Sequence, residues 1–101
     1  MMALRVWICF LAAVAVAQSQ RTDARKAEEA FSQARKLEIG QQEQAALERF
    51  SEAIRYAPDF AAAFRHRGKL HMALGHTAEA LTDLNQALRL QTDDAEAYHL
   101  R

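Results

Sequence analysis

The sequence has very little of what interrupts a helix and almost nothing that would cross-link one. Its 101 residues include one proline, three glycines and one cysteine. A single cysteine excludes an intrachain disulfide framework and any zinc cage built from cysteines. Alanine is abundant, and no segment shows the apolar–polar alternation of a half-buried strand. We therefore predict an all-α protein of at most one domain.

Neither sign of charge is in excess. The chain carries 13 lysines and arginines against 13 aspartates and glutamates, for a formal net charge of +0. No strongly basic footprint is present, so we expect no nucleic-acid partner. Hydrophobic residues make up 50% of the chain and charged residues 26%, a balance that excludes a disordered low-complexity chain.

Long hydrophobic runs are also absent, except for one near the N-terminus. Residues 6–17 (VWICFLAAVAVA) are uninterruptedly apolar, follow Arg5 and give way at once to Gln18. The run is too short to span a bilayer and suits a signal peptide, with Ala15–Val16–Ala17 as the small-residue cleavage pattern. We predict a signal peptide at 1–17, export to a bacterial periplasm or a eukaryotic ER lumen or exterior, and no stable membrane span after cleavage. An uncleaved signal anchor or a buried first helix is the alternative.

The rest of the chain repeats itself with a period of 34 residues. Ala27, Ala61 and Ala95 occupy one position of the repeat. Identical pairs at the same offset are Ala46 and Ala80, Leu47 and Leu81, Ala53 and Ala87, Arg55 and Arg89, Asp59 and Asp93, and Arg67 and Arg101. A repeat of this length accommodates two helices and two turns.

The helix-terminating residues divide this region into five predicted helices. They lie at residues 23–39, 43–57, 60–74 and 77–90, with a fifth beginning after Asp94. Gly40 and Gly75 end the first and third, and Pro58 ends the second because it lacks an N–H group. The fifth is expected because Asp93 and Glu96 have the spacing of a capping box.

One detail leaves the register of the first helix open by a residue. Gly40 lies six residues before Ala46, whereas Gly75 lies five before Ala80. We expect Ala30, Ala34 and Leu37 to face inward, since i, i+4, i+7 spacing places them on one stripe.

This pattern of small and large residues resembles the tetratricopeptide repeat family. The matching positions are Ala46, Phe50, Ala53, Pro58, Phe64, Gly68, Ala80, Leu84 and Ala87. The resemblance covers 27–101 and implies an α-solenoid of helix-turn-helix repeats. Its parts would be a lead-in at 18–26, repeats at 27–60 and 61–94, and an incomplete third repeat at 95–101. Small residues let paired helices approach closely, and each repeat needs a neighbour to bury its apolar stripe.

The resemblance also implies where a partner binds, because the first helices of such arrays line a concave groove. The corresponding candidate residues are Phe31, Arg35, Arg65, Lys69, Met72 and His99. They predict a basic centre flanked by two apolar side chains, suited to a peptide with an acidic side chain or a terminal carboxylate. The alternative is an ordinary solvated face carrying charges of both signs.

Catalytic and metal-binding patterns were sought among the histidines and serines. His66, His71 and His76 are five residues apart, so neighbours on a continuous helix would point about 140° apart and share no metal. We expect His71 to pack and the other two to lie on the surface. No serine has the glycine-flanked turn of a nucleophile, and no phosphate-binding glycine loop is present. We predict no enzyme activity and no cofactor.

These observations favour an exported scaffold that binds a protein or peptide. Two alternatives stay open. The chain is the non-catalytic N-terminal region of a larger secretory-pathway co-chaperone or enzyme whose active part lies beyond residue 101, or it is a structural piece of an assembly. Because three repeats are usually needed for stability, we expect the parent protein to continue. A chain that ends at Arg101 is expected to self-associate through Tyr98 and Leu100.

Overall fold

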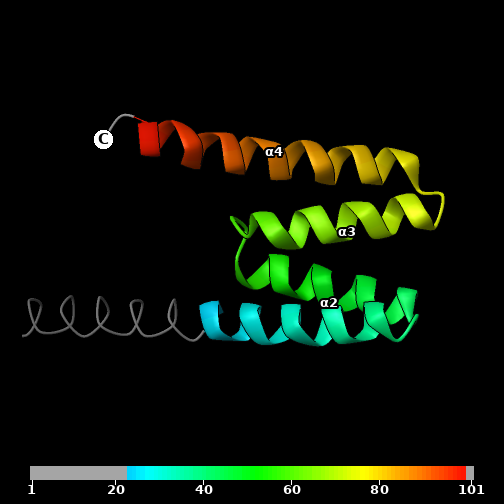
Figure 1. The fold of residues 1–101 in the computed structure, drawn as a ribbon. Helices are drawn as coiled ribbons and strands as arrows, with labels where there is room; N and C mark the ends of the chain where they lie inside the picture. The colour runs from blue at the N-terminus through cyan, green and yellow to red at the C-terminus, as the bar shows by residue number, and fades with distance from the viewer. Residues whose placement is uncertain (1–22, 100–101) are drawn as a thin grey trace, which may run out of the picture.

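The computed structural model describes residues 23–99, and all regular structure within that range is helical. A helix at residues 23–39, here named the leading helix, precedes α2 (Glu43–Tyr56), α3 (Ala61–Ala73) and α4 (Thr77–His99). Successive helices run back and forth in antiparallel order (Figure 1). The predicted all-α architecture of helix-turn-helix units is thereby confirmed. The predicted signal peptide lies outside the described residues.

The turn between α3 and α4 depends on a left-handed glycine. Gly75 has φ 82°, a conformation that costs other residues energy because Cβ meets the backbone. The Gly75 N–H bonds to the Met72 carbonyl at 3.1 Å, and the His76 N–H bonds to the His71 carbonyl at 2.8 Å. This pair of bonds is a Schellman cap, which satisfies carbonyls left open at the helix end.

The turn after the leading helix is built in the same way, but its left-handed residue is not the predicted glycine. Gln41 has φ 61°, and the N–H of Gln42 bonds to the Leu37 carbonyl at 2.9 Å. Gln41 stands 34 residues before Gly75, so the repeat runs through this turn without a shift. Gly40 lies one residue before the left-handed position and is not the cap. The register of the leading helix, which the glycine spacing left open by one residue, is therefore fixed by Gln41.

The predicted fifth helix is wrong. No break follows Asp94, and α4 continues without interruption to His99. Thr92 occupies the repeat position of Pro58, and its hydroxyl donates to the Leu88 carbonyl at 2.8 Å within the helix. Because threonine keeps its backbone N–H, nothing at this position ends the helix as Pro58 does after α2.

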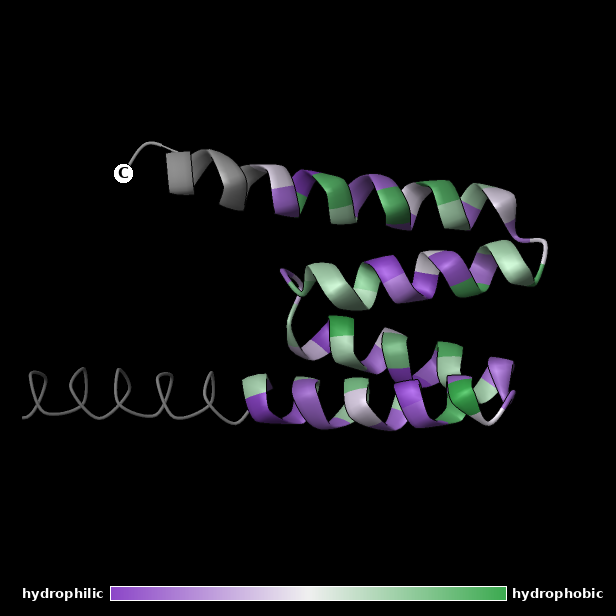
Figure 2. Ribbon diagram, in the orientation of Figure 1, coloured by the Kyte–Doolittle hydropathy of each residue, from purple (hydrophilic) through white to green (hydrophobic). Residues whose placement is uncertain are grey.

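Small residues dominate the core between the helices. Each helix carries hydrophobic residues recurring among polar ones (Figure 2). Buried members from neighbouring helices pack together in two clusters. The buried alanines are Ala27, Ala30, Ala34, Ala46, Ala53, Ala63, Ala80 and Ala87. Ala30 and Ala34 are buried and Leu37 packs against their neighbours, so the predicted inward stripe of the leading helix is confirmed.

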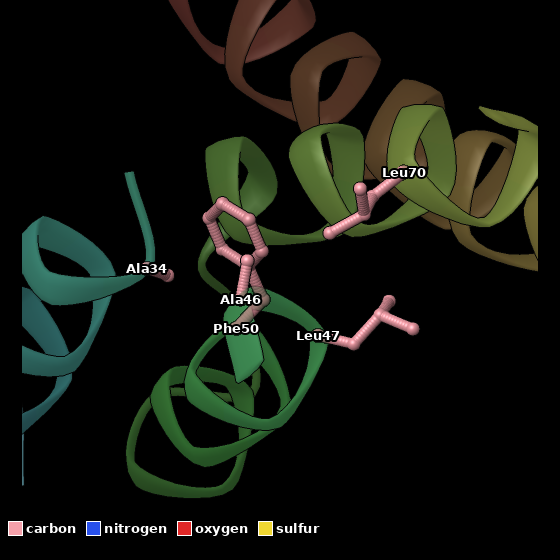
Figure 3. Close-up of a cluster of buried hydrophobic side chains, with 5 residues drawn as sticks. All are labelled: Ala34, Ala46, Leu47, Phe50 and Leu70. Carbon is pink, nitrogen blue, oxygen red and sulfur yellow. The ribbon is translucent and has the colours of Figure 1, made fainter. Parts of the chain in front are cut away.

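One cluster joins three of the helices. Figure 3 shows its members converging, with the ring of Phe50 reaching from α2 toward α3. The cluster consists of Ala34, Ala46, Leu47, Phe50 and Leu70. Phe50 is the largest fully buried side chain among the described residues. Since its bulk is accommodated by alanines on facing turns, large and small residues interlock here.

Helices α3 and α4 approach each other closely at Gly68. A Cβ atom placed on Gly68 would lie 2.9 Å from Leu84 Cγ and 3.2 Å from the Ala80 carbonyl oxygen. Both distances are shorter than ordinary contacts, so a side chain here would push the helices apart. The remaining repeat positions follow the same arrangement: Leu84 and Phe64 are half-buried, and Pro58 is exposed at the turn after α2.

Candidate functional site

The predicted peptide-binding residues come from two helices that pack together. Phe31 and Arg35 lie on the leading helix, and Arg65, Lys69 and Met72 lie on α3. The two helices meet through aromatic rings and through two polar contacts of His66. The side chain of the sixth candidate, His99, lies outside the described part of the structure.

The contact between these helices centres on His66, which we expected on the surface. That expectation is wrong, because only 15% of the His66 side chain is exposed. Its ring stacks on Phe50 at a centroid distance of 5.7 Å and an angle of 9°, and meets the edge of Phe31 at 5.5 Å. The sequence shows His66 on one face of α3, but only the position of the leading helix decides that this face is covered.

The polar atoms of His66 contact a charged pair on the leading helix. Nε2 lies 3.1 Å from Arg35 Nη1, and Nδ1 lies 3.6 Å from Glu38 Oε2. A guanidinium can only donate, so His66 Nε2 accepts and its proton resides on Nδ1, facing the carboxylate. Arg35 Nε also approaches the same Glu38 oxygen, at 3.6 Å. The neutral imidazole therefore orients Arg35.

One positive side chain contacts this imidazole, and two more lie on its own helix, at the preceding residue and one turn further on. Burial lowers the pKa of His66 below its usual value of 6.5, and the charge of Arg35 lowers this pKa further. Glu38 acts in the opposite direction, whereas Arg65 and Lys69 add to the lowering. Arg65 and Lys69 share one face of α3, because their spacing is i, i+4. We call Arg35, Arg65 and Lys69 the basic face.

The cations of the basic face differ in how they are held. Arg35 is 45% exposed and contacts both His66 and Glu38. Arg65 and Lys69 are exposed, and neither forms an ion pair with any side chain described within residues 23–92. These two side chains are therefore oriented toward solvent with their charge uncompensated by a direct contact.

The two apolar candidates occupy different environments. Phe31 is half-buried, with its ring stacked on Phe60 at 4.8 Å and against the edge of Phe50 at 5.8 Å. Its ring thus joins the helices to one another. Met72 is 55% exposed and lies one turn beyond Lys69 on α3, where an incoming group can reach it.

The sequence did not predict the buried ion pair between Arg67 of α3 and Asp83 of α4. Arg67 Nε and Nη2 donate to the two carboxylate oxygens of Asp83 at 2.7 and 2.8 Å, and Arg67 Nη1 donates to Ser51 Oγ at 3.2 Å. Only 5% of the Asp83 side chain is exposed. The burial of Asp83 could have been predicted, because Asp83 falls on the inward stripe between Ala80 and Ala87. The three residues tie α2, α3 and α4 together.

At the α3–α4 turn His71 is half-buried and His76 is exposed, as expected, but the two rings do not point apart. His71 Nδ1 and His76 Nδ1 are 3.1 Å apart, although their spacing on a continuous helix would separate them. The helix ends at Ala73, and the left-handed Gly75 returns the chain so that the rings meet. Among the side chains described within residues 23–92, no group of three or more metal-ligating residues is gathered.

An open hollow of about 570 Å³ runs along the outer side of α2. It is lined by Gln44, Leu47, Glu48, Arg49, Ser51, Glu52, Arg55 and His71. None of the predicted peptide-binding residues lines it, and its charged side chains have both signs. The basic face is therefore a separate feature of the surface.

The fold and these contacts define an all-α helical-repeat protein. Its cationic surface lies on the leading helix and α3, which are the first helices of the two repeats. Residues 61–94 match the tetratricopeptide repeat family, a span of about a third of the chain that coincides with the second repeat found by self-comparison. The match and the helical hairpins support a tetratricopeptide repeat protein. No curated protein matches the chain.

Between residues 23 and 99, no helix combines the length and the apolar character needed to cross a bilayer.

Proposed function

We propose that this chain is an exported, non-catalytic scaffold that binds a protein or peptide through the basic face. Tetratricopeptide repeats are generally interaction modules, and the match to this family supports an interaction role. The observation that carries the more specific proposal is that Arg65 and Lys69 are exposed on one face of α3, the helix whose His66 contacts Arg35. Neither of these two exposed cations has an ion-pair partner among the side chains described within residues 23–92.

The chemistry of the basic face favours an anionic group on the partner. Guanidinium and ammonium groups bind carboxylates through charge-assisted hydrogen bonds, and Arg35 is already oriented by His66. Exposed Met72 offers an apolar contact beyond Lys69. We therefore propose a partner segment with an acidic side chain or a free terminal carboxylate.

The binding test uses a fluorescein-labelled tetraglutamate peptide with a free carboxyl terminus as a probe. Fluorescence anisotropy with the chain is expected to show saturable binding. The double variant Arg65→Glu with Lys69→Glu should weaken it by about tenfold or more, because two attractive charges become repulsive. A probe with an amidated terminus separates the contribution of the terminal carboxylate from that of the side chains.

The matched control is Lys36→Glu with Arg55→Glu. Both residues are exposed and lie outside the basic face, and the double change alters net charge by the same amount. This control should retain binding. Equal losses in the two double variants would mean that only overall charge attracts the probe, and the assignment of the basic face would then be wrong.

The proposed export rests on residues 1–17 and has its own test. An intact-mass measurement on protein from its native source should show an N-terminus at Gln18, since cleavage is expected after Ala17. Retention of the apolar run would contradict the cleaved signal peptide and leave the binding proposal untouched.

A further inference from the structure

Two histidine rings meet at the α3–α4 turn through the same ring nitrogen. His71 Nδ1 and His76 Nδ1 are 3.1 Å apart, and the ring centroids are 5.3 Å apart. Because a zinc–nitrogen bond measures about 2.0–2.1 Å, two nitrogens on one ion lie about 2.8–3.4 Å apart at octahedral to tetrahedral angles. The two nitrogens therefore already have the spacing of two ligands of one metal ion. We call His71 and His76 the histidine pair.

The turn does not need these histidines for its own structure. The equivalent turn after the leading helix has Leu37 and Gln42 at the same two positions of the repeat. Its closing bond, from the Gln42 N–H to the Leu37 carbonyl, measures 2.9 Å, against 2.8 Å for the bond from His76 to His71. The same cap thus forms with side chains other than imidazole. The histidine pair is an addition to the second turn and not a requirement of the repeat.

The surroundings of His71 favour the tautomer that suits a metal ligand. Its other nitrogen, Nε2, lies 3.9 Å from Asp83 Oδ2, a carboxylate oxygen that Arg67 also contacts. A carboxylate on this side favours the proton on Nε2, as it does for histidines that bind metals, and leaves the lone pair on Nδ1. His76 then donates the Nδ1 proton in the hydrogen bond between the rings. Because His76 is exposed, that proton can move to its Nε2 in water when a metal ion replaces the bond.

A metal ion can reach the histidine pair from solvent. His76 is exposed, and His71 lines the open hollow of about 570 Å³ along α2. The hydrogen bond aligns the two nitrogens with each other, so one ring must tilt before both lone pairs converge on an ion. The exposed His76 side chain can make that movement without disturbing the core. No third metal-ligating residue is gathered with the pair among the side chains described within residues 23–92, so water fills the remaining positions.

We propose that the histidine pair binds a divalent metal ion that favours nitrogen ligands, such as Zn²⁺, through both Nδ1 atoms. Imidazole nitrogen is a preferred ligand of such ions, whereas Mg²⁺ and Ca²⁺ prefer oxygen. The sequence argued against a shared metal only for a continuous helix, and α3 ends at Ala73. The site is separate from the basic face and does not depend on the proposed binding of an anionic partner.

The bound ion ties the last turn of α3 to the residue that precedes α4. His71 belongs to α3, and His76 stands immediately before Thr77, where α4 begins. An ion held by both side chains binds only the folded turn, because the two rings are brought together by the path of the chain through Gly75. Binding therefore stabilises the helical hairpin in proportion to the zinc concentration relative to the dissociation constant.

The test titrates ZnCl₂ into the ¹⁵N-labelled full chain and follows the histidine ring nitrogens in long-range ¹H–¹⁵N spectra. We expect the Nδ1 signals of His71 and His76 to shift together and to saturate, while MgCl₂ shifts neither. His76→Gln should weaken zinc binding by about tenfold or more, because even groups that only support a ligand contribute about 10–100-fold to metal affinity. Zinc should also raise the melting temperature of the unmodified chain more than that of His76→Gln.

The His76→Gln substitution is compatible with the fold, because Gln42 occupies the same repeat position in the first turn. The control variant is His99→Gln, which makes the same change elsewhere in the chain and should bind zinc as the unmodified chain does. Ring-nitrogen signals that do not respond to zinc overturn the proposal, and so do shifts confined to one of the two rings. Equal weakening by both variants also overturns it, because the ion would then not distinguish the histidine pair from a histidine elsewhere.

Discussion

Both oxygens of the Asp83 carboxylate accept hydrogen bonds from Arg67, which joins α3 to α4 through a bidentate pair at 2.7 and 2.8 Å. The carboxylate is almost fully enclosed, while the guanidinium keeps part of its surface exposed. A third bond from Arg67 reaches Ser51 on α2. The pair therefore fixes the relative positions of three helices, and it stands at the centre of the second repeat.

Removing the charge of Asp83 should destabilise the fold strongly. Asp83→Asn is expected to lower the free energy of unfolding by about 2–4 kcal/mol, because it leaves the Arg67 guanidinium partly buried without its counter-charge. Urea unfolding followed by circular dichroism measures the loss. The double variant Arg67→Met with Asp83→Leu should recover much of it. A loss within about 0.5 kcal/mol for Asp83→Asn would show that the pair contributes little.

The left-handed residue at the first turn offers a stabilising substitution. Gln41→Gly should raise the free energy of unfolding by about 0.5–1 kcal/mol, because glycine adopts a φ of 61° without a Cβ clash. The converse change at the second turn, Gly75→Ala, should lower it by about 1 kcal/mol, since a Cβ there meets no neighbour and only the backbone strain acts. Thermal and urea unfolding measure both. An unchanged stability for Gln41→Gly would argue against the left-handed cap.

His66 should make the fold sensitive to mild acid. Its pKa is lowered by burial first and then by Arg35, so the folded state binds its proton less readily than the unfolded state. The stability it contributes is complete above pH 6.5, declines as the pH falls toward the folded-state pKa, and is constant below that value. Unfolding free energies measured across this range should show the slope. His66→Phe should remove it, and NMR titration should place the His66 pKa below 6.5. A pKa at or above 6.5 would contradict an enclosed ring in contact with Arg35.

A single proline should restore the helix end that the sequence suggested. Thr92→Pro removes the N–H group and places the ring against the Leu88 carbonyl. By analogy with α2, which ends at Tyr56 before Pro58, α4 should then end near Leu90. Sequential amide NOEs and backbone shifts would report the new end, and Thr92→Ala should leave α4 continuous. Helical backbone shifts that persist on both sides of the substituted position would show that the length of α4 has another cause.

The period of the repeat was sufficient to predict much of the fold. The helices predicted at 43–57 and 60–74 differ from α2 and α3 by one residue at their ends. Pro58 and Gly75 act locally, through a missing donor and a permitted left-handed φ, so their effects can be read without tertiary information. The predicted end of α4 was wrong because Asp93 and Glu96 suit the start of a helix but do not prevent a preceding helix from continuing.

The candidate site was predictable only in part. The sequence placed Arg65 and Lys69 on one face of α3, since i, i+4 spacing is a local property. It did not reveal that His66 lies beneath Arg35, because that contact joins residues 31 positions apart and depends on how the leading helix crosses α3. The meeting of His71 and His76 likewise required the path of the turn.

By itself, the sequence determined the helices, most of their ends and the small residues at which they approach, because periodicity and backbone restrictions are local. Tertiary structure decided which polar groups are enclosed. In the sequence, Asp83 and His66 are ordinary polar residues. Packing of neighbouring helices pairs Asp83 with Arg67 and lowers the pKa of His66. Tertiary structure also decided that Leu47 of α2 is buried in a cluster with Leu70 of α3, because burial depends on which helix lies alongside.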